Sequence, residues 1–138
     1  MVDYIKTIVA ALTIMITAAT IYPYTYKDAE LLAEVIYYEN WNTDKEKEAA
    51  YLTGAVVMNR VHSTEWPDTI KDVLYQRGQY STTKKFFTKE IPNECLEMAI
   101  KILAEGTEDV PKDVVFQATF KQGKIYKVIN GEYFCYGR

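Results

Sequence analysis

Residues 114–136 read VVFQATFKQGKIYKVINGEYFCY, and this stretch decides the fold class because the period of its apolar residues changes from that of a helix to that of strands. A period of two residues is that of a half-buried strand and not of a helix. Gln122-Gly123 and Asn130-Gly131 interrupt the pattern, and Asn-Gly is the strongest short signal for a tight hairpin turn. We therefore predict three antiparallel strands, over Val114–Phe120, Ile125–Ile129 and Tyr133–Tyr136.

Before this stretch the apolar residues recur at helical spacing instead. The predicted helices cover Lys27 to Tyr38 or slightly beyond, Thr43–Val61, a short helix opened by Pro67, and the segment from Pro92 to Gly106. Thr43 followed by Glu46 matches a capping box, which predicts the start of the second helix. Its apolar face is expected at Ala49, Leu52, Thr53, Val56 and Val57. Helices first and strands last predict an α+β domain with a small antiparallel sheet packed at one end.

Composition is that of one globular domain. The 138 residues are enough to bury a hydrophobic core, and 49% hydrophobic with 25% charged residues is typical of a folded protein. A formal net charge of -3 argues against a nucleic-acid partner, because phosphate binding normally needs a basic face. The 12 tyrosines suit either a surface that stacks on sugar rings or a core.

The first residues have the pattern of an export signal. Lys6 precedes an uncharged apolar run over residues 7–22, a length typical of a signal-peptide core and short for a membrane-spanning helix. We predict that residues 1–25 form a cleaved signal peptide or a retained membrane anchor through residues 7–22. Either would place a folded domain of residues 26–138 outside the cytoplasm, at the cell wall.

Cysteine and histidine are too scarce to build most catalytic or metal sites. Two cysteines, Cys95 and Cys135, fit neither a zinc cluster nor a disulfide scaffold, and whether they pair after export stays open. The single histidine, His62, follows the second predicted helix, where the helix dipole alone explains it. We therefore expect no metal and no organic cofactor, and an enzyme built on this chain would use carboxylates.

Glu39 is the carboxylate whose position suggests chemistry. At about 100° per residue it lies within roughly 20° of Leu32 on the apolar stripe of the first helix, whereas Glu34 lies about 140° away from it. We therefore predict that Glu30 and Glu34 are solvated surface carboxylates. Burial and the negative end of the helix dipole would both raise the pKa of Glu39, as a general acid requires. If the helix ends before residue 39, Glu39 points into water instead.

Four motifs in order give the chain a family resemblance: LAEVIYYEN at residues 32–40, LTGAVVMNRV at 52–61, WPDTI at 66–70 and VLYQRGQYS at 73–81. Together they resemble the spore cortex-lytic and cell-wall hydrolase family of the SleB type, over roughly residues 31–136. The resemblance implies a lysozyme-like or transglycosylase-like helical lobe that cuts the glycan strands of peptidoglycan. The essential glutamate of the family falls on Glu39.

The chain departs from the family pattern beside the expected cleft. Asn40-Trp41-Asn42-Thr43 replaces the usual Ala-Arg-Gly-Glu, and Thr82-Thr83-Lys84-Lys85-Phe86-Phe87 replaces an Asp-Gly turn. A histidine common in the last strand is replaced by tyrosine or cysteine. These differences put substrate preference and rate in question more than the fold.

A search for a second carboxylate placed like Glu39 finds none. Asp44, Glu46, Glu48, Glu65 and Asp68 all lie at predicted helix starts, where capping and the dipole account for acids. This favours a lytic transglycosylase in which one glutamate acts as acid and then as base. The alternatives are a lysozyme-type hydrolase, a catalytically weak module that binds peptidoglycan, and, if the resemblance is misleading, an unrelated interaction domain.

The remaining predictions concern substrate contacts. Asn59 lies on the inward side of its helix, and it would either hold Glu39 or the substrate or tie structural elements together. Arg60 is expected to be a helix-end cation. The expected glycan contacts are Tyr38, Asn59, Gln79, Tyr80, Ser81, Phe116 and Tyr126, of which the aromatic ones could instead be core. The expected partner is a peptidoglycan strand bound by a monomer, and the sequence does not distinguish spore cortex from vegetative or host wall.

Overall fold

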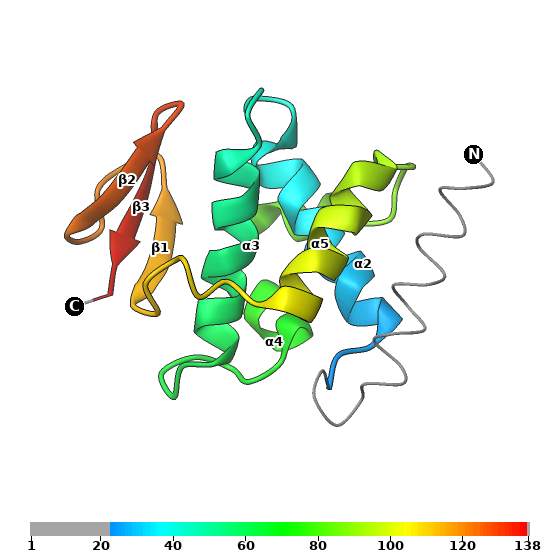
Figure 1. Cartoon of the computed structure of the whole chain (residues 1–138), viewed down its shortest axis with the longest axis horizontal. Coiled ribbons are helices and arrows are strands. Elements are labelled where there is room, and N and C mark those ends of the chain that lie inside the picture. Colours follow the sequence, from blue (N-terminus) through cyan, green and yellow to red (C-terminus); the bar gives the residue numbers. More distant parts are fainter. Residues whose placement is uncertain (1–22, 138) are drawn as a thin grey trace.

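The structure is a computed structural model that describes residues 23–137, and it has the predicted α+β class (Figure 1). The helical elements are α2 (Tyr26–Ile36), the π-helical turn η1 (Tyr37–Trp41), α3 (Glu48–Val61), α4 (Ile70–Leu74), the 3-10 turn η2 (Ser81–Lys85) and α5 (Asn93–Glu105). The strands are β1 (Val114–Ala118), β2 (Ile125–Ile129) and β3 (Glu132–Tyr136). The predicted signal peptide or anchor lies outside the described residues. Within residues 23–137 no helix is both long and apolar enough to cross a membrane.

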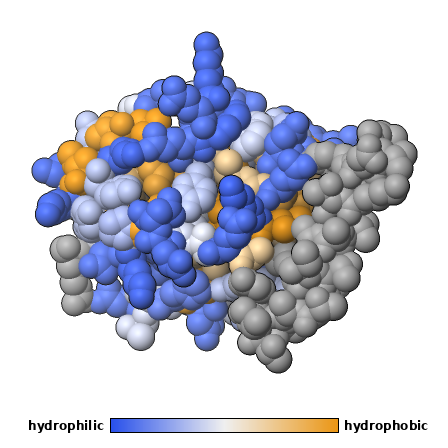
Figure 2. Space-filling view, viewed as in Figure 1, coloured by the Kyte–Doolittle hydropathy of each residue, from blue (hydrophilic) through white to orange (hydrophobic). Residues whose placement is uncertain are grey.

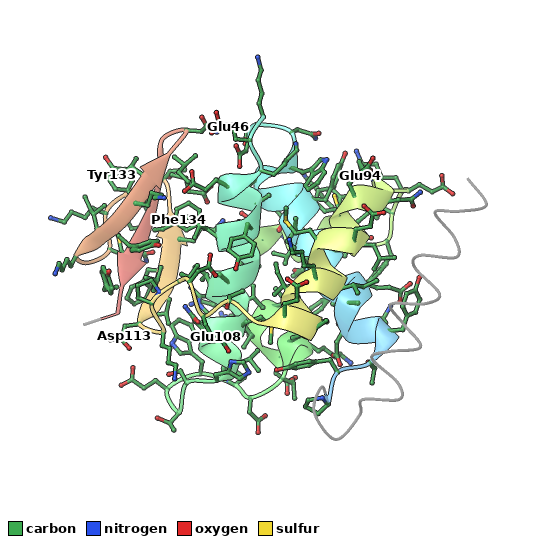
Figure 3. The ribbon with its side chains drawn as sticks, in the orientation of Figure 1. Glu46, Glu94, Glu108, Asp113, Tyr133 and Phe134 are labelled. Carbon is green, nitrogen blue, oxygen red and sulfur yellow. The ribbon has the colours of Figure 1, made fainter. Side chains whose placement is uncertain are left out.

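Helix α3 lies between the other helices and the sheet (Figure 1). One apolar cluster joins it to α2, α4 and α5 and includes Leu32, Val57 and Leu103. A second cluster joins it to the sheet through Val56, Val114 and Phe134, and Figure 3 shows Phe134 on the side of β3 that faces α3. The predicted apolar face of α3 is buried, but so is nearly every other residue of the helix, because both sides are covered.

The sheet is antiparallel in the order β1-β3-β2. Asn130 and Gly131 have φ angles of 52° and 78°, as a tight hairpin turn between β2 and β3 requires, so the Asn-Gly prediction is confirmed. Strand β1 ends at Ala118, two residues before the predicted end. Ile125 and Val128 leave large apolar surfaces exposed on β2, and Figure 2 shows an apolar patch over the sheet.

Two predicted helix starts are wrong. Helix α3 begins at Glu48 and has no Thr43–Glu46 capping box. Its first amides are bound instead by Asp44, whose Oδ2 accepts hydrogen bonds from Ala49 N at 2.6 Å and Ala50 N at 3.4 Å. Helix α4 begins at Ile70 rather than at Pro67, because the Thr69 side chain accepts a hydrogen bond from Asp72 N and caps it.

The predicted stop of α5 is confirmed, since Gly106 follows the helix with a φ of 79°. The two cysteines do not form a disulfide: Cys95 and Cys135 are buried free thiols. Cys95 lies on α5 and Cys135 on β3, and in Figure 1 α3 lies between these elements. Burial raises the pKa of the Cys95 thiol to about 12.

Candidate active site

Glu39 lies in η1, just beyond the end of α2. Its neighbour Asn40 is buried and donates a 2.7 Å hydrogen bond from Nδ2 to Thr53 Oγ1 on α3. Thr53 Oγ1 donates in turn to Ala49 O at 2.9 Å, so the turn is fixed to the central helix. Single π-helical turns are frequent at functional sites. This wider turn also takes Glu39 off the regular helical wheel from which its position was predicted.

Glu39 is half-buried, and a hydroxyl from η2 reaches it. Thr82 donates from Oγ1 to Glu39 Oε1 at 2.6 Å. Burial raises the pKa of Glu39, the hydrogen bond from Thr82 lowers it, and the negative charge of Glu132 raises it again, with a net rise. The predicted raised pKa is therefore confirmed. A carboxyl that keeps its proton to higher pH can protonate a leaving oxygen.

Tyr80 lies beside this carboxyl. The side chain is 8% exposed, and the charges of both Glu39 and Glu132 act on it. Burial raises the pKa of Tyr80 to about 12, and the Arg60 guanidinium, 5.3 Å from the ring centroid, opposes that rise. The Tyr80 hydroxyl has no hydrogen-bond partner among residues 23–137. A buried donor without a partner is costly, so this hydroxyl suits a polar group of a ligand.

Glu132 is the site residue that the sequence search missed. It opens β3 directly after the Asn130-Gly131 turn, and its Oε1 accepts a 2.8 Å hydrogen bond from Gln117 Nε2 on β1. Its negative charge is the smallest of the causes that act on the pKa of Glu39, after burial and the hydrogen bond from Thr82. Glu132 lies in a strand next to a hairpin turn, so neither helical periodicity nor a capping pattern marks it as a site residue. The sequence therefore carries no local signal for this effect on Glu39.

Arg60 lies in the last turn of α3, as predicted, but it is buried. It is 4% exposed because β1 and the loop before η2 cover it. Its Nε donates to Val115 O at 2.7 Å and its Nη1 donates to Gln79 Oε1 at 3.2 Å. The guanidinium also lies 4.1 Å from the ring centroid of Trp66. Arg60 therefore connects α3 to the sheet and to the loop that carries Gln79 and Tyr80.

Glu34 is also corrected. It was predicted to be solvated, but it is 4% exposed and accepts a hydrogen bond from Phe87 N at 3.2 Å. The segment after η2 returns over this side of α2, which no pattern within the helix reveals. Burial raises the pKa of Glu34. Glu30 is partly exposed and lies 3.7 Å from Lys27, as expected of a surface carboxylate.

The predicted glycan contacts fall into separate groups. Gln79, Tyr80 and Ser81 share the loop that leads to Thr82, and Gln79 and Ser81 are exposed. The Phe116 ring packs edge-on against Trp66, and both are half-buried. Asn59 donates from Nδ2 to Pro111 O and Val114 O, both at 3.0 Å, so it ties α3 to the approach to β1.

Two of the predicted aromatic contacts point elsewhere. The Tyr38 ring stacks on Phe86, with centroids 6.1 Å apart, and Tyr126 packs edge-on against Tyr136. Both belong to apolar packing at the edges of the core. His62 is exposed at the end of α3, where its Nε2 lies 2.9 Å from the Tyr24 hydroxyl.

Two cavities of the described residues are not lined by Glu39 itself. One of about 870 Å³ lies near the carboxyl end of α3 and is lined by Asn59, His62 and Trp66 among others. Another of about 400 Å³ borders Gln79, Tyr80 and Ser81. Glu39 lines neither, so its surroundings and not an enclosed cavity define the candidate site. Residues 23–137 hold no group of three or more His, Cys, Asp or Glu side chains arranged to bind a metal ion.

Comparison with known proteins identifies a family. The profile of the Cell Wall Hydrolase family matches residues 32–132, which span Glu39, Tyr80, Thr82 and Glu132. Neither the curated proteins nor the solved structures contain a match. The family match covers most of the chain. The chain belongs to the cell wall hydrolase family.

Proposed function

We propose that this protein cleaves the glycan strands of peptidoglycan, with Glu39 as the general acid. Family membership supports a hydrolase that acts on the cell wall and therefore outside the cytoplasm. The observation that carries the finer proposal is the half-buried Glu39 carboxyl, whose pKa is raised by burial beside the unpaired Tyr80 hydroxyl. Protonation of the glycosidic oxygen needs such a carboxyl, because an alkoxide is a poor leaving group at neutral pH.

In the first step the Glu39 proton passes to the glycosidic oxygen while the bond from that oxygen to the anomeric carbon breaks. Positive charge then develops at the anomeric carbon. In a single-glutamate transglycosylase, the Glu39 carboxylate next takes a proton from a hydroxyl of the same muramic acid residue. The hydroxyl oxygen bonds to the anomeric carbon, and an anhydro-muramic end forms without water.

A lysozyme-type hydrolase is the second candidate, and Glu132 is the observation that favours it. The sequence argument for a single glutamate depended on the absence of a second carboxylate near Glu39. Since Glu132 lies close enough for its charge to raise the pKa of Glu39, that argument no longer separates the two routes. A hydrolase would add water at the anomeric carbon and leave a reducing end.

The test is mass spectrometry of the soluble fragments released from peptidoglycan by the full chain. Glu39→Gln is the inactive variant, and Glu30→Gln on α2 is the matched control because Glu30 is partly exposed. We expect muropeptides from the wild type and from Glu30→Gln and none from Glu39→Gln. Anhydro ends would support the transglycosylase, and reducing ends the hydrolase. If the folded wild type binds peptidoglycan and releases nothing, the enzyme proposal is wrong and a binding module remains.

A further inference from the structure

Glu132 lies on the side of β3 that faces the helical lobe. Side chains two residues apart in a strand share a face, so Glu132 points to the same side as Phe134, which packs between the sheet and α3 (Figure 3). Gln117 is paired with Phe134 across the β1–β3 ladder and shares that face too. The Gln117–Glu132 hydrogen bond therefore forms on the inner side of the sheet.

The hairpin that carries Glu132 is attached beside η1. Asn130 Nδ2 donates a 2.8 Å hydrogen bond to Thr43 O, four residues after Glu39. Lys127 on β2 also pairs with Glu48 at the first turn of α3. These contacts bring the start of β3 to the same end of the helical lobe as Glu39. The two carboxylates thus come from different parts of the fold, Glu39 from the helices and Glu132 from the sheet, at the same end of the junction between them.

Two buried polar atoms between these lobes have no partner within the described residues: Gln117 Oε1 and the Tyr80 hydroxyl. The Tyr80 side chain is 8% exposed, and besides this burial the negative charges of Glu39 and Glu132 both raise the pKa of its hydroxyl. A sugar ring carries hydroxyl and amide groups that can donate to one such atom and accept from the other. A site for a sugar ring would present an unpaired donor, such as the Tyr80 hydroxyl, and an unpaired acceptor, such as Gln117 Oε1. Both atoms are present here together with the two carboxylates.

We propose that Glu132 is the second catalytic carboxylate of this site and stabilises the positive charge that develops at the anomeric carbon as Glu39 protonates the leaving oxygen. The inference rests on the proposed function. Glu132 stays negatively charged throughout this step and exchanges no proton, so the bond and proton changes are those already written for Glu39. Gln117 positions it by holding Oε1. Among the described residues, the Tyr80 hydroxyl, the Arg60 guanidinium and the Lys127–Glu48 ion pair are further titratable or charged groups at this junction.

A carboxylate that stabilises the anomeric carbon acts most strongly in the transition state, because the sugar ring carries positive charge there. Removing its charge should therefore lower kcat and leave KM nearly unchanged. It should also lower the pKa of Glu39, because the charge of Glu132 contributes to raising it. A general acid works in its protonated form, so the alkaline limb of the pH–rate profile would move to lower pH. That shift reports the charge of Glu132 at Glu39, and the fall in kcat at unchanged KM is the readout that a purely structural role would not produce.

The experiment compares the full chain with Glu132→Gln, Glu132→Asp and Glu46→Gln on soluble glycan oligomers, after circular dichroism has shown that each is folded. For Glu132→Gln we expect kcat to fall on the order of 10²-fold and the alkaline limb to move down in pH. Glu132→Asp keeps the charge and should keep the alkaline limb near its wild-type position, with a smaller loss of kcat. Glu46, exposed in the loop before α3, is the matched control.

The outcomes separate the two proposals. An active wild type whose Glu132→Gln variant keeps both kcat and the alkaline limb would overturn the role of Glu132 alone. If Glu132→Gln is poorly folded, a folded Glu132→Asp variant with the kcat of the wild type overturns it equally, since shortening the side chain moves the charge away from the ring. A folded wild type that cleaves no glycan would overturn the proposed function, and the inference with it.

Discussion

Thr82 shows how much one residue can set the chemistry of Glu39. It belongs to the stretch Thr82-Thr83-Lys84-Lys85, which departs from the family pattern, and its hydroxyl is 2.6 Å from Glu39 Oε1. A hydrogen bond donated to a carboxylate favours the ionised form, so Thr82 lowers the pKa that burial has raised. The departure therefore changes the pH at which the acid can work rather than removing the acid.

Replacing Thr82 with valine should move the alkaline limit of activity upward. Valine has nearly the same shape but cannot donate, so the pKa of Glu39 would rise further. Glu39 must be protonated to act, and activity is lost as pH rises through its pKa, so the Thr82→Val variant should remain active at a higher pH than the wild type. The measurement is kcat against pH.

Ser81→Ala is the control for that measurement, because Ser81 is the exposed neighbour of Thr82 and makes no hydrogen bond with Glu39 in the described part of the chain. Its pH profile should match that of the wild type. A Thr82→Val profile that superimposes on the wild type would mean that this hydrogen bond does not govern the acid.

Residue-scale prediction from sequence succeeded where the environment is local and failed where it is assembled from distant segments. The apolar stripe around Leu32 and Val35 was enough to predict a raised pKa at Glu39. Glu34 was mispredicted because the chain at Phe87 covers it from 53 positions away. Glu132 was missed because its nearness to Glu39 depends on how a hairpin docks on the helices.

At the scale of elements, Asp44 caps the start of α3 in place of the predicted Thr43–Glu46 capping box. Its carboxylate is 4% exposed and accepts hydrogen bonds from the amides of Glu46, Ala49 and Ala50. The Thr43 hydroxyl, which was expected to cap α3, donates to Asn40 O instead. Thr43, Asp44 and Glu46 could each cap a helix that starts here. In the structure, the backbone after the π-helical turn places Asp44 at the free amides of α3.

Asp44→Ala should lower the free energy of unfolding by roughly 2 kcal/mol, because it removes a cap and leaves buried amides without an acceptor. Glu46→Ala, at the other member of the predicted box, should change it by less than about 0.5 kcal/mol, since Glu46 is exposed (Figure 3). Urea unfolding of both variants measures the difference. Equal losses would mean that the cap is shared or that Asp44 is not the cap.

Element prediction was most accurate where a short signal fixes the backbone. The bounds of β2 and the stop of α5 at Gly106 match the prediction, and Asn130-Gly131 forms its turn. The strand order β1-β3-β2 was not predicted, because hairpin signals identify neighbours in sequence and not the strand that returns to the centre. The burial of α3 on nearly all sides was not predicted either, since it follows from packing between two layers.

At the scale of the whole molecule, α3 joins the two lobes, and Arg60 near its end is the densest polar connection. Asn59 and Arg60 donate to Pro111 O, Val114 O and Val115 O, which fixes β1 against the helix. Arg60 also holds Gln79, and through it the loop that carries Tyr80 and Thr82. The position of the sheet relative to the loop of Tyr80 and Thr82 therefore depends on a buried guanidinium.

Arg60→Lys should destabilise the fold by about 2–3 kcal/mol, although the charge is kept. A lysine ammonium cannot lie flat against Trp66 while also reaching Val115 O and Gln79 Oε1, so a buried acceptor would be left unpaired. Urea unfolding gives the loss, and Lys127→Met is the control. Lys127 is paired with Glu48 on the exposed surface, where an ion pair contributes about 1 kcal/mol or less. If Arg60→Lys unfolds at the same urea concentration as the wild type, the lobes are held by apolar packing around Phe134, and the guanidinium does not set the position of β1.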